Sequence, residues 1–234
     1  GDIMQKRLSL IISLVIIFIF IPLTLYAGIV LFNDRKYYFI SIMIIILASI
    51  PFFLSFERRK PQPREILIIA VMSAISVTGR ALFVITPGFK PVAAIAAITG
   101  FSLGAEAGFL TGAISALVSN MFFGQGPWTP FQMFMWGMIG FIGGLLGRTG
   151  IMHKKIPLIL FGIFAGILFS FGMDIWGTMS LYGVFSMEAY IVALTSAVPF
   201  TIVYAVSNVI FLLILARPIR EKLERINNKY GTFQ

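Results

Sequence analysis

The sequence predicts an all-α integral membrane protein: a six-helix bundle over about residues 65–216, preceded by two additional transmembrane helices. Three observations support this fold class. Of the 234 residues, 59% are hydrophobic and 12% are charged, against roughly 45–50% and about 25% in soluble domains. The mean hydropathy is +0.97. The apolar residues also form runs of about the 20 that a helix needs to cross a bilayer, without the alternation typical of strands.

The charge distribution and the cysteine count exclude other classes. The net charge of +9 lies in short clusters between the apolar runs, which favours contact with a lipid bilayer and argues against a nucleic-acid partner. The chain has no cysteine, so it is not a disulfide scaffold.

The first 64 residues contain two predicted transmembrane helices that are additional to the core. Residues 1–7 are interpreted as a tag remnant and a basic cytoplasmic N-terminus. Segment 8–56 holds two apolar runs, 8–32 and 37–56. The first run is longer than the roughly 7–15 apolar residues of a signal peptide, so we expect it to be retained. A basic, proline-bearing cytoplasmic linker, 57–64, follows.

The core begins with an apolar run over 65–86 and continues with an unusually long one over 91–123. As one helix, the long run would measure roughly 50 Å, well beyond a hydrocarbon core of about 30 Å. We therefore expect a hairpin of two short helices that turns near Glu106. The remaining predicted helices are 129–147, 156–176 and 189–216, and a basic cytoplasmic tail, 217–234, ends the chain.

The lysines and arginines support this hairpin and predict the orientation. With eight helices, both termini are cytoplasmic and the exterior keeps only Arg35, Lys36 and Lys90. The cytoplasmic side then holds Lys6, Arg7, Arg58, Arg59, Lys60, Arg64, Arg148, Lys154, Lys155, Arg217, Arg220, Lys222, Arg225 and Lys229. If run 91–123 were a single helix, every later segment would lie on the opposite side of the membrane. The basic segments 148–155 and 217–229 would then be exterior, against the positive-inside rule. We expect a multi-pass protein of the bacterial plasma membrane, with exterior loops at 33–36, 87–90, 124–128 and 177–188.

Small residues recur every fourth position in the predicted hairpin, at Gly100, Gly104, Gly108, Gly112 and Ala116. Such a face allows two helix backbones to approach closely inside a bundle. Ala70 and Ala74 have the same spacing on the helix that follows the basic linker. Because of that position, this second pair could also receive a helix of a partner protein.

Arg80 is the most informative charged residue, because it lies inside the predicted span 65–86. An arginine at the centre of a membrane costs roughly 2.5–3.5 kcal/mol on insertion scales. Its side chain could extend to the head-groups, or it could serve a solvated cavity on the exterior side. Asp174 and Glu188 are candidate counter-charges.

The segment 119–132 is the most distinctive part of the chain. Its two glycines and two prolines predict an ordered turn. Asn120, Gln125 and Gln132 provide uncharged hydrogen-bonding groups and Trp128 provides a flat apolar face, a mixture typical of a small-molecule site. The alternative interpretation is an aromatic belt at the membrane interface.

Catalytic and metal-binding patterns are missing from the sequence. His153 is the only histidine and lies in a basic loop, no cysteine is available as a nucleophile, and the carboxylates are scattered. No nucleotide-binding motif is present. We expect no enzymatic activity, no metal and no cofactor, so any energy for transport must come from a gradient or from a partner.

From about residue 65 onward the chain resembles the substrate-binding S component of an energy-coupling factor (ECF) vitamin transporter. The resemblance is carried by Ala70 and Ala74, by Phe89-Lys90-Pro91, by the glycine-rich run 100–112 and above all by 119–133. It implies a six-helix core with an exterior pocket. It also implies that the alanine pair faces an EcfT-type coupling protein driven by two cytosolic ATPases, and that the subunit topples to release its substrate inward.

Within this family, segment 119–133 most resembles the cobalamin branch, so cobalamin or a related corrinoid is the first expectation for the substrate. Queuosine-type, α-ribazole, riboflavin and folate substrates stay open. The expected binding residues are Arg80, Lys90, Asn120, Gln125, Trp128, Gln132 and Trp136. Arg80 would engage a polar or anionic group, the amides would read hydrogen-bonding edges and the tryptophans would stack. A free-standing gradient-driven carrier is the main rival function; an intramembrane enzyme and a structural scaffold have less support.

Overall fold

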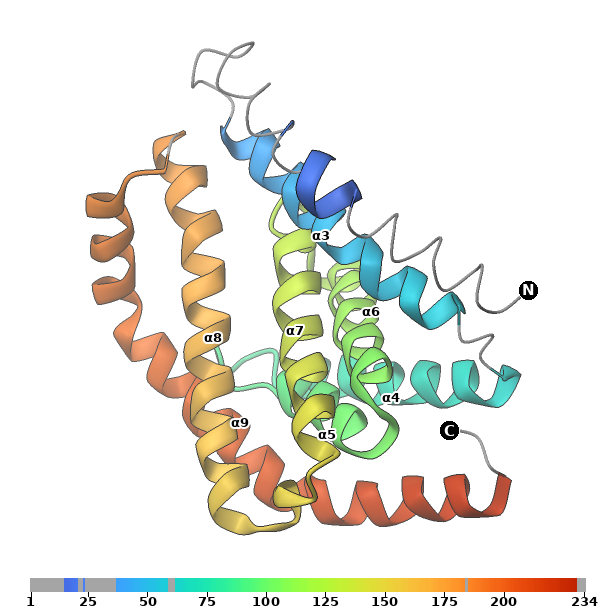
Figure 1. The fold of residues 1–234 in the computed structure, drawn as a ribbon. Helices are drawn as coiled ribbons and strands as arrows, with labels where there is room; N and C mark the ends of the chain where they lie inside the picture. The colour runs from blue at the N-terminus through green and yellow to red at the C-terminus, as the bar shows by residue number, and fades with distance from the viewer. Residues whose placement is uncertain (1–14, 21–22, 24–36, 59–61, 184, 231–234) are drawn as a thin grey trace.

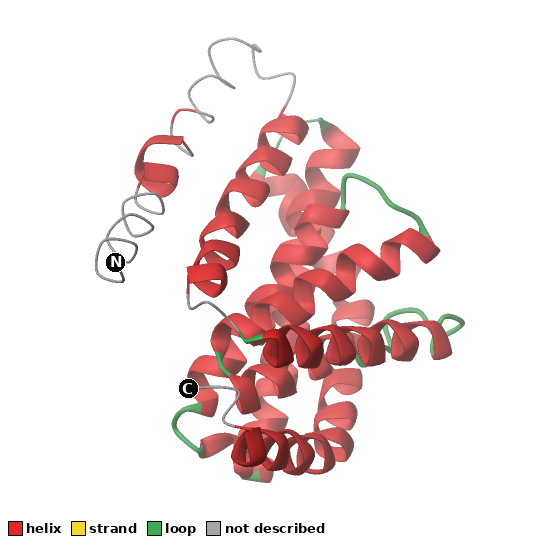
Figure 2. Ribbon diagram, turned by 90° about the vertical axis from the view of Figure 1, so that its right-hand side faces the viewer, coloured by secondary structure: helices red, strands yellow, loops and turns green. Residues whose placement is uncertain are grey.

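The computed structural model describes residues 15–20, 23, 37–58, 62–183 and 185–230, and within these ranges it contains helices and loops but no strand (Figures 1 and 2). The predicted all-α fold is confirmed. Most of the first predicted span, 8–32, lies outside the described residues. The elements in chain order are η1 (Ile16–Phe20), α3 (Tyr37–Arg58), α4 (Pro63–Leu82), α5 (Val92–Leu103), α6 (Ala105–Phe123), α7 (Thr129–Gly147), η2 (Ile151–His153), α8 (Lys155–Tyr182) and α9 (Met187–Tyr230).

Among the described helices, α4, α6, α7, α8 and α9 are long and apolar enough to cross a membrane. Helices α6, α7 and α8 run side by side, whereas α4 runs across the bundle near α5 (Figure 1). The long apolar run is divided as expected, because α5 ends at Leu103 and α6 begins at Ala105. The residue between them, Gly104, has a φ of 105°, a backbone conformation that a side chain would strain.

Glycines bring α5, α6 and α7 into backbone contact. A methyl group added to Gly108 would lie 2.3 Å from the Gly140 carbonyl oxygen, and one added to Gly112 would lie 2.3 Å from the Trp136 carbonyl oxygen. Both distances are far inside van der Waals contact. The small-residue ladder predicted from the sequence therefore serves internal packing, as expected where lipid gives helices little hydrophobic reason to associate.

Helix α3 packs mainly on α6 and α7. The Phe52 ring stacks on Phe109 with a centroid distance of 4.1 Å and meets the edge of Phe141 at 4.9 Å. At the end of α3, the Ser55 hydroxyl donates to Glu106 Oε1 over 3.3 Å. Aromatic contacts and one polar contact thus join this additional helix to the bundle.

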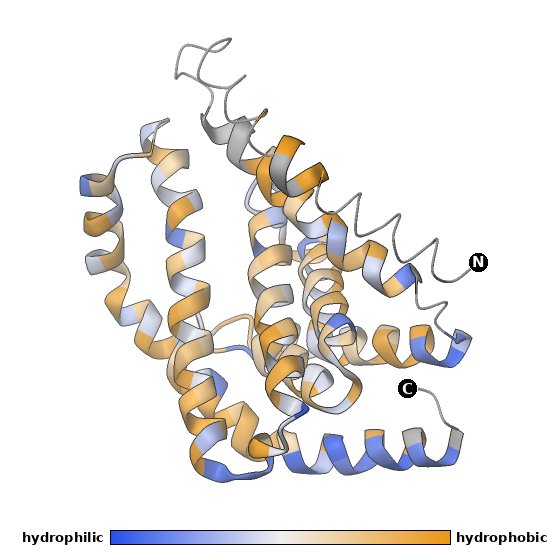
Figure 3. Ribbon diagram, in the orientation of Figure 1, coloured by the Kyte–Doolittle hydropathy of each residue, from blue (hydrophilic) through white to orange (hydrophobic). Residues whose placement is uncertain are grey.

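The last two helices are longer than predicted. Helix α8 extends to Tyr182 and α9 begins at Met187, so the loop expected over 177–188 shrinks to the residues between them. The expected tail is helical up to Tyr230 and passes below α4 (Figure 1). This part of the helix is mostly hydrophilic, with a few separate hydrophobic residues (Figure 3). Leu223 of this tail is buried with Ile69 and Met72 of α4, which explains why the helix continues.

Candidate functional site

A small cavity of about 20 Å³ lies where the loop after α4 meets α5, α7, α8 and α9. This is room for about one water molecule and far less than a typical ligand pocket of about 300–1,000 Å³, so a ligand would bind here only after the lining residues move apart. The lining residues are Gly88, Lys90, Val92, Ala93, Trp136, Phe169, Tyr204 and Asn208. The wall is therefore aromatic and aliphatic, with four side chains that carry polar groups.

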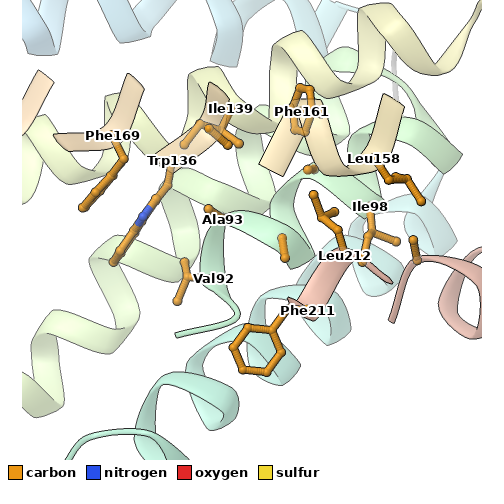
Figure 4. Close-up of a cluster of buried hydrophobic side chains, with 14 of the residues drawn as sticks. Val92, Ala93, Ile98, Trp136, Ile139, Leu158, Phe161, Phe169, Phe211 and Leu212 are labelled. Atoms are coloured by element: carbon orange, nitrogen blue, oxygen red, sulfur yellow. The ribbon is translucent and has the colours of Figure 1, made fainter. Parts of the chain in front are cut away.

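The aromatic wall is centred on Trp136 of α7. Its ring stacks on Phe169 of α8 at 5.2 Å, with an angle of 7° between the planes, and Phe169 meets the edge of Tyr204 at 5.1 Å. Figure 4 shows the first two rings lying parallel, with Val92 and Ala93 beside Trp136. Offset stacks of this kind are a preferred aromatic geometry, and both rings are almost fully buried.

The loop that carries Lys90 is held against α9. The Lys90 amide donates to Ser207 Oγ over 2.9 Å, and the same hydroxyl donates back to the Lys90 carbonyl over 3.1 Å. Gly88 adopts a φ of 79°, and a methyl group there would lie 3.1 Å from Val203. Burial lowers the pKa of the Lys90 ammonium below its usual range, and the positive charge of Arg80 lowers it further.

Arg80 lies in the last turn of α4 and is only 8% exposed. Its Nη1 donates to Ser119 Oγ and, over 2.8 Å, to Asn120 Oδ1. The guanidinium also lies 5.3 Å from the centre of the Trp136 ring. Arg80 makes no ion pair with a described carboxylate.

The expected counter-charges of Arg80 are therefore not its partners. Asp174 accepts a hydrogen bond from Ser170 over 3.4 Å. Ser170 in turn shares a 2.7 Å hydrogen bond with Thr201 of α9. This cluster joins α8 to α9.

The three predicted amide residues form a network that supports Arg80. The Asn120 amide group donates to Gln132 Oε1 over 2.8 Å and to Thr129 Oγ1 over 3.0 Å. Thr129 donates to Gln125 Oε1 over 2.9 Å. Because the Asn120 amide nitrogen donates to Gln132 and Thr129, the amide oxygen is directed to Arg80.

The structure thus divides the seven expected site residues into groups. Lys90 and Trp136 line the cavity, and Arg80 adjoins it. Asn120, Gln125 and Gln132 belong to the supporting network. Trp128 packs edge-on against Trp176 at 5.8 Å and is not part of the lining.

Sequence reasoning missed the contributions of α8 and α9, namely Phe169, Tyr204 and Asn208. One signal was available for the last of these. Asn208 is a polar side chain within the apolar run 189–216, and polar side chains inside a membrane span are typical of functional sites. Phe169 resembles the many other phenylalanines of this chain and carries no such signal.

The predicted partner-binding alanines lie on an open face of α4. Ala70 and Ala74 are exposed. So are their neighbours on this face, Leu67, Val71 and Ile75. Nothing in the described chain covers this face.

The fold and the cavity define a helical, multi-span membrane protein with an internal aromatic site. A family comparison makes the class specific: the model of the ECF-type riboflavin transporter, S component, matches residues 60–225. The chain belongs to this family, which is a family of transporter components and not of enzymes. S components bind a small vitamin and work with an EcfT protein and ATPase subunits. The comparisons with curated proteins and with solved structures give no match.

The match refines the sequence prediction in two ways. It supports the S component assignment but gives no support to the cobalamin branch, because the matching family is the riboflavin one. It also begins at residue 60, so α3 lies outside the matched segment.

Proposed function

We propose that this protein is the substrate-binding subunit of an ECF-type importer and that it captures a planar vitamin of the flavin class in the cavity beside Trp136. The observation that carries this proposal is the parallel Trp136–Phe169 stack in the cavity wall. A fused-ring ligand can extend such a stack, while Lys90 and Asn208 provide hydrogen-bonding groups for its heteroatoms and its tail.

The small cavity favours a flavin over a corrinoid. A corrin with its nucleotide loop is several times larger than a three-ring flavin, so the cavity of about 20 Å³ would have to open much less for a flavin. Among the substrates considered from the sequence, riboflavin is the one that the matching family names. Cobalamin, favoured by segment 119–133, would require a much larger opening of the bundle.

The rest of the chain is proposed to serve transport. Residues 65–216 form the binding core, 8–56 an accessory segment, 57–64 a cytoplasmic linker and 217–234 a cytoplasmic tail. In this arrangement both termini are cytoplasmic. Loop 87–90 then faces the exterior and admits the substrate.

Energy for transport is proposed to come from partners, because the sequence has no nucleotide-binding motif. The coupling protein would dock on Ala70 and Ala74, and toppling of the subunit would release the vitamin inward. Helix α3 packs mainly on α6 and α7. The open face of α4 is therefore compatible with such docking.

The test is a titration of the purified, detergent-solubilised protein with riboflavin. Binding is measured by calorimetry and by the quenching of flavin fluorescence. We expect submicromolar affinity, about −8 kcal/mol or tighter. Phe169→Ala should weaken binding at least tenfold, whereas Phe164→Ala, on the exposed side of the same helix, should leave it unchanged. Absence of riboflavin binding, with tight binding of another vitamin, would refute the flavin assignment.

A gradient-driven carrier is distinguished by transport assays in liposomes. The proposed subunit should not accumulate riboflavin when it is reconstituted alone. Uptake should require the coupling protein, the ATPases and ATP. Accumulation by the protein alone under an ion gradient would favour the carrier instead.

A further inference from the structure

Two cations adjoin the aromatic cavity without an acidic partner. Arg80 is almost fully buried, and its two hydrogen bonds end on neutral oxygens of Ser119 and Asn120. Lys90 lines the cavity, and within the described part of the chain its side chain has neither an ion pair nor a hydrogen bond. The carboxylate of Asp174 also acts electrostatically on Tyr204 in the cavity wall, but it accepts its hydrogen bond from Ser170 and not from either cation.

This arrangement is costly for the empty protein. Burial disfavours the charged form of each cation, and two neighbouring cations repel each other. The depressed pKa of Lys90 reflects both the burial and the neighbouring Arg80. An anion in the cavity would offset this cost.

Unused hydrogen-bond donors lie at the same place. Asn208 lines the cavity and is 4% exposed, yet its side chain has no hydrogen bond to any described residue. Buried polar side chains are normally hydrogen-bonded, so an unpartnered amide at a cavity wall points to a ligand. A guanidinium also carries five N–H donors. Both hydrogen bonds of Arg80 come from Nη1, so the N–H groups on its other two nitrogens are among these unused donors.

Hydrogen bonds hold the Arg80 guanidinium and the backbone of Lys90 in place. Asn120 presents its oxygen to Arg80 because its nitrogen is engaged by Gln132 and Thr129. The backbone of Lys90 is held by Ser207 in both directions. The positive charge is thus pre-organised beside the Trp136–Phe169 stack, and little ordering remains to be done when a ligand binds.

We propose that the preferred substrate of this subunit carries an anionic group, a phosphate ester or a carboxylate, which binds to Lys90 and Asn208 in the field of Arg80 while its ring system lies against Trp136. This inference rests on the proposed function and specifies the substrate class of the same site. A neutral flavin would contact the aromatic residues of the cavity wall and leave the two cations unpaired.

The experiment compares three flavins that share one ring system: riboflavin, riboflavin 5′-phosphate and a flavin with a carboxymethyl group on the ring nitrogen. Each is titrated into the purified protein by calorimetry at low and at high salt. We expect at least one anionic flavin to bind tenfold or more tightly than riboflavin, with an advantage that shrinks as salt rises. Whichever of the two anionic flavins binds more tightly shows whether the site prefers a phosphate or a carboxylate.

Variants then locate the anionic group. Lys90→Gln and Asn208→Leu should each reduce the ratio of anionic to neutral affinity at least fivefold. Lys154→Gln, which alters an exposed lysine in the loop before α8, is the matched control and should leave the ratio unchanged. Thermal unfolding of each variant in detergent confirms that it is folded.

The outcomes separate the two proposals. Riboflavin binding that equals or exceeds binding of both anionic flavins would overturn the anion site and leave the flavin function intact. An anionic preference that survives both Lys90→Gln and Asn208→Leu would also overturn the site. If none of the three flavins binds, the proposed flavin function is itself refuted, and the inference falls with it.

Discussion

Gly108→Ala provides the sharpest test of the packing that holds the site together. A methyl group at this position would lie 2.3 Å from the Gly140 oxygen, 2.6 Å from the Gly140 carbonyl carbon and 2.7 Å from the Gly100 Cα. All three atoms belong to backbone and cannot rotate away, so α5 and α7 must both move. Overpacking of this kind costs typically 1–3 kcal/mol, and we expect about 2–3 kcal/mol here.

The matched control is Gly177→Ala on α8, where an added methyl group meets nothing within 4 Å. Alanine favours a helix by roughly 0.5–1 kcal/mol over glycine, so this variant should be slightly more stable than the wild type. The assay is thermal unfolding in detergent, measured by fluorescence-detected size-exclusion chromatography. For a chain of this size Gly108→Ala should lower the midpoint by roughly 5–10 °C. A midpoint equal to the wild type would refute the close approach of α6 to α7.

Three further predictions concern the site and its surroundings. Asn120→Leu should lower thermal stability by about 2 kcal/mol, because it removes a hydrogen bond to a charged group and two neutral ones; an unchanged midpoint would contradict the network. Affinity for an anionic flavin should fall as pH rises through the depressed pKa of Lys90, hence below the usual 10.5, since only the protonated amine attracts the anion; a profile identical in Lys90→Gln would contradict this. Ala70→Leu with Ala74→Leu should abolish co-purification with the coupling protein while vitamin binding persists, because both positions are exposed and neither belongs to the cavity lining; retained co-purification would exclude that face.

Helix α3 is the feature that the matching family segment does not include. It is joined to the bundle by the Phe52 stack and by the Ser55–Glu106 hydrogen bond. Because these contacts reach α6 and α7, the helix lies against the elements that carry the Asn120 network. It leaves the open alanine face of α4 uncovered.

The secondary structure followed from the sequence because the relevant physics is local. A membrane helix satisfies its backbone hydrogen bonds within itself, so an apolar run of sufficient length already specifies one. Helix α7 spans 129–147 as predicted, and the long run 91–123 breaks at Gly104, where the backbone needs a positive φ. The end of α9 was mispredicted because its helical extension depends on burial of Leu223 against α4, a contact between residues far apart in the chain.

The candidate site was only partly predictable, and for a physical reason. Residue type and motif resemblance pointed to Arg80, Lys90 and the amides, since polar groups near a membrane span are conspicuous in any sequence. Which of them meet one another depends on how the helices pack. Only the tertiary structure pairs Arg80 with Asn120 instead of Asp174, and only it brings Phe169 and Asn208 to the cavity beside Trp136. Local sequence patterns specify the helices and their membrane environment, whereas long-range packing selects the side chains that line the cavity.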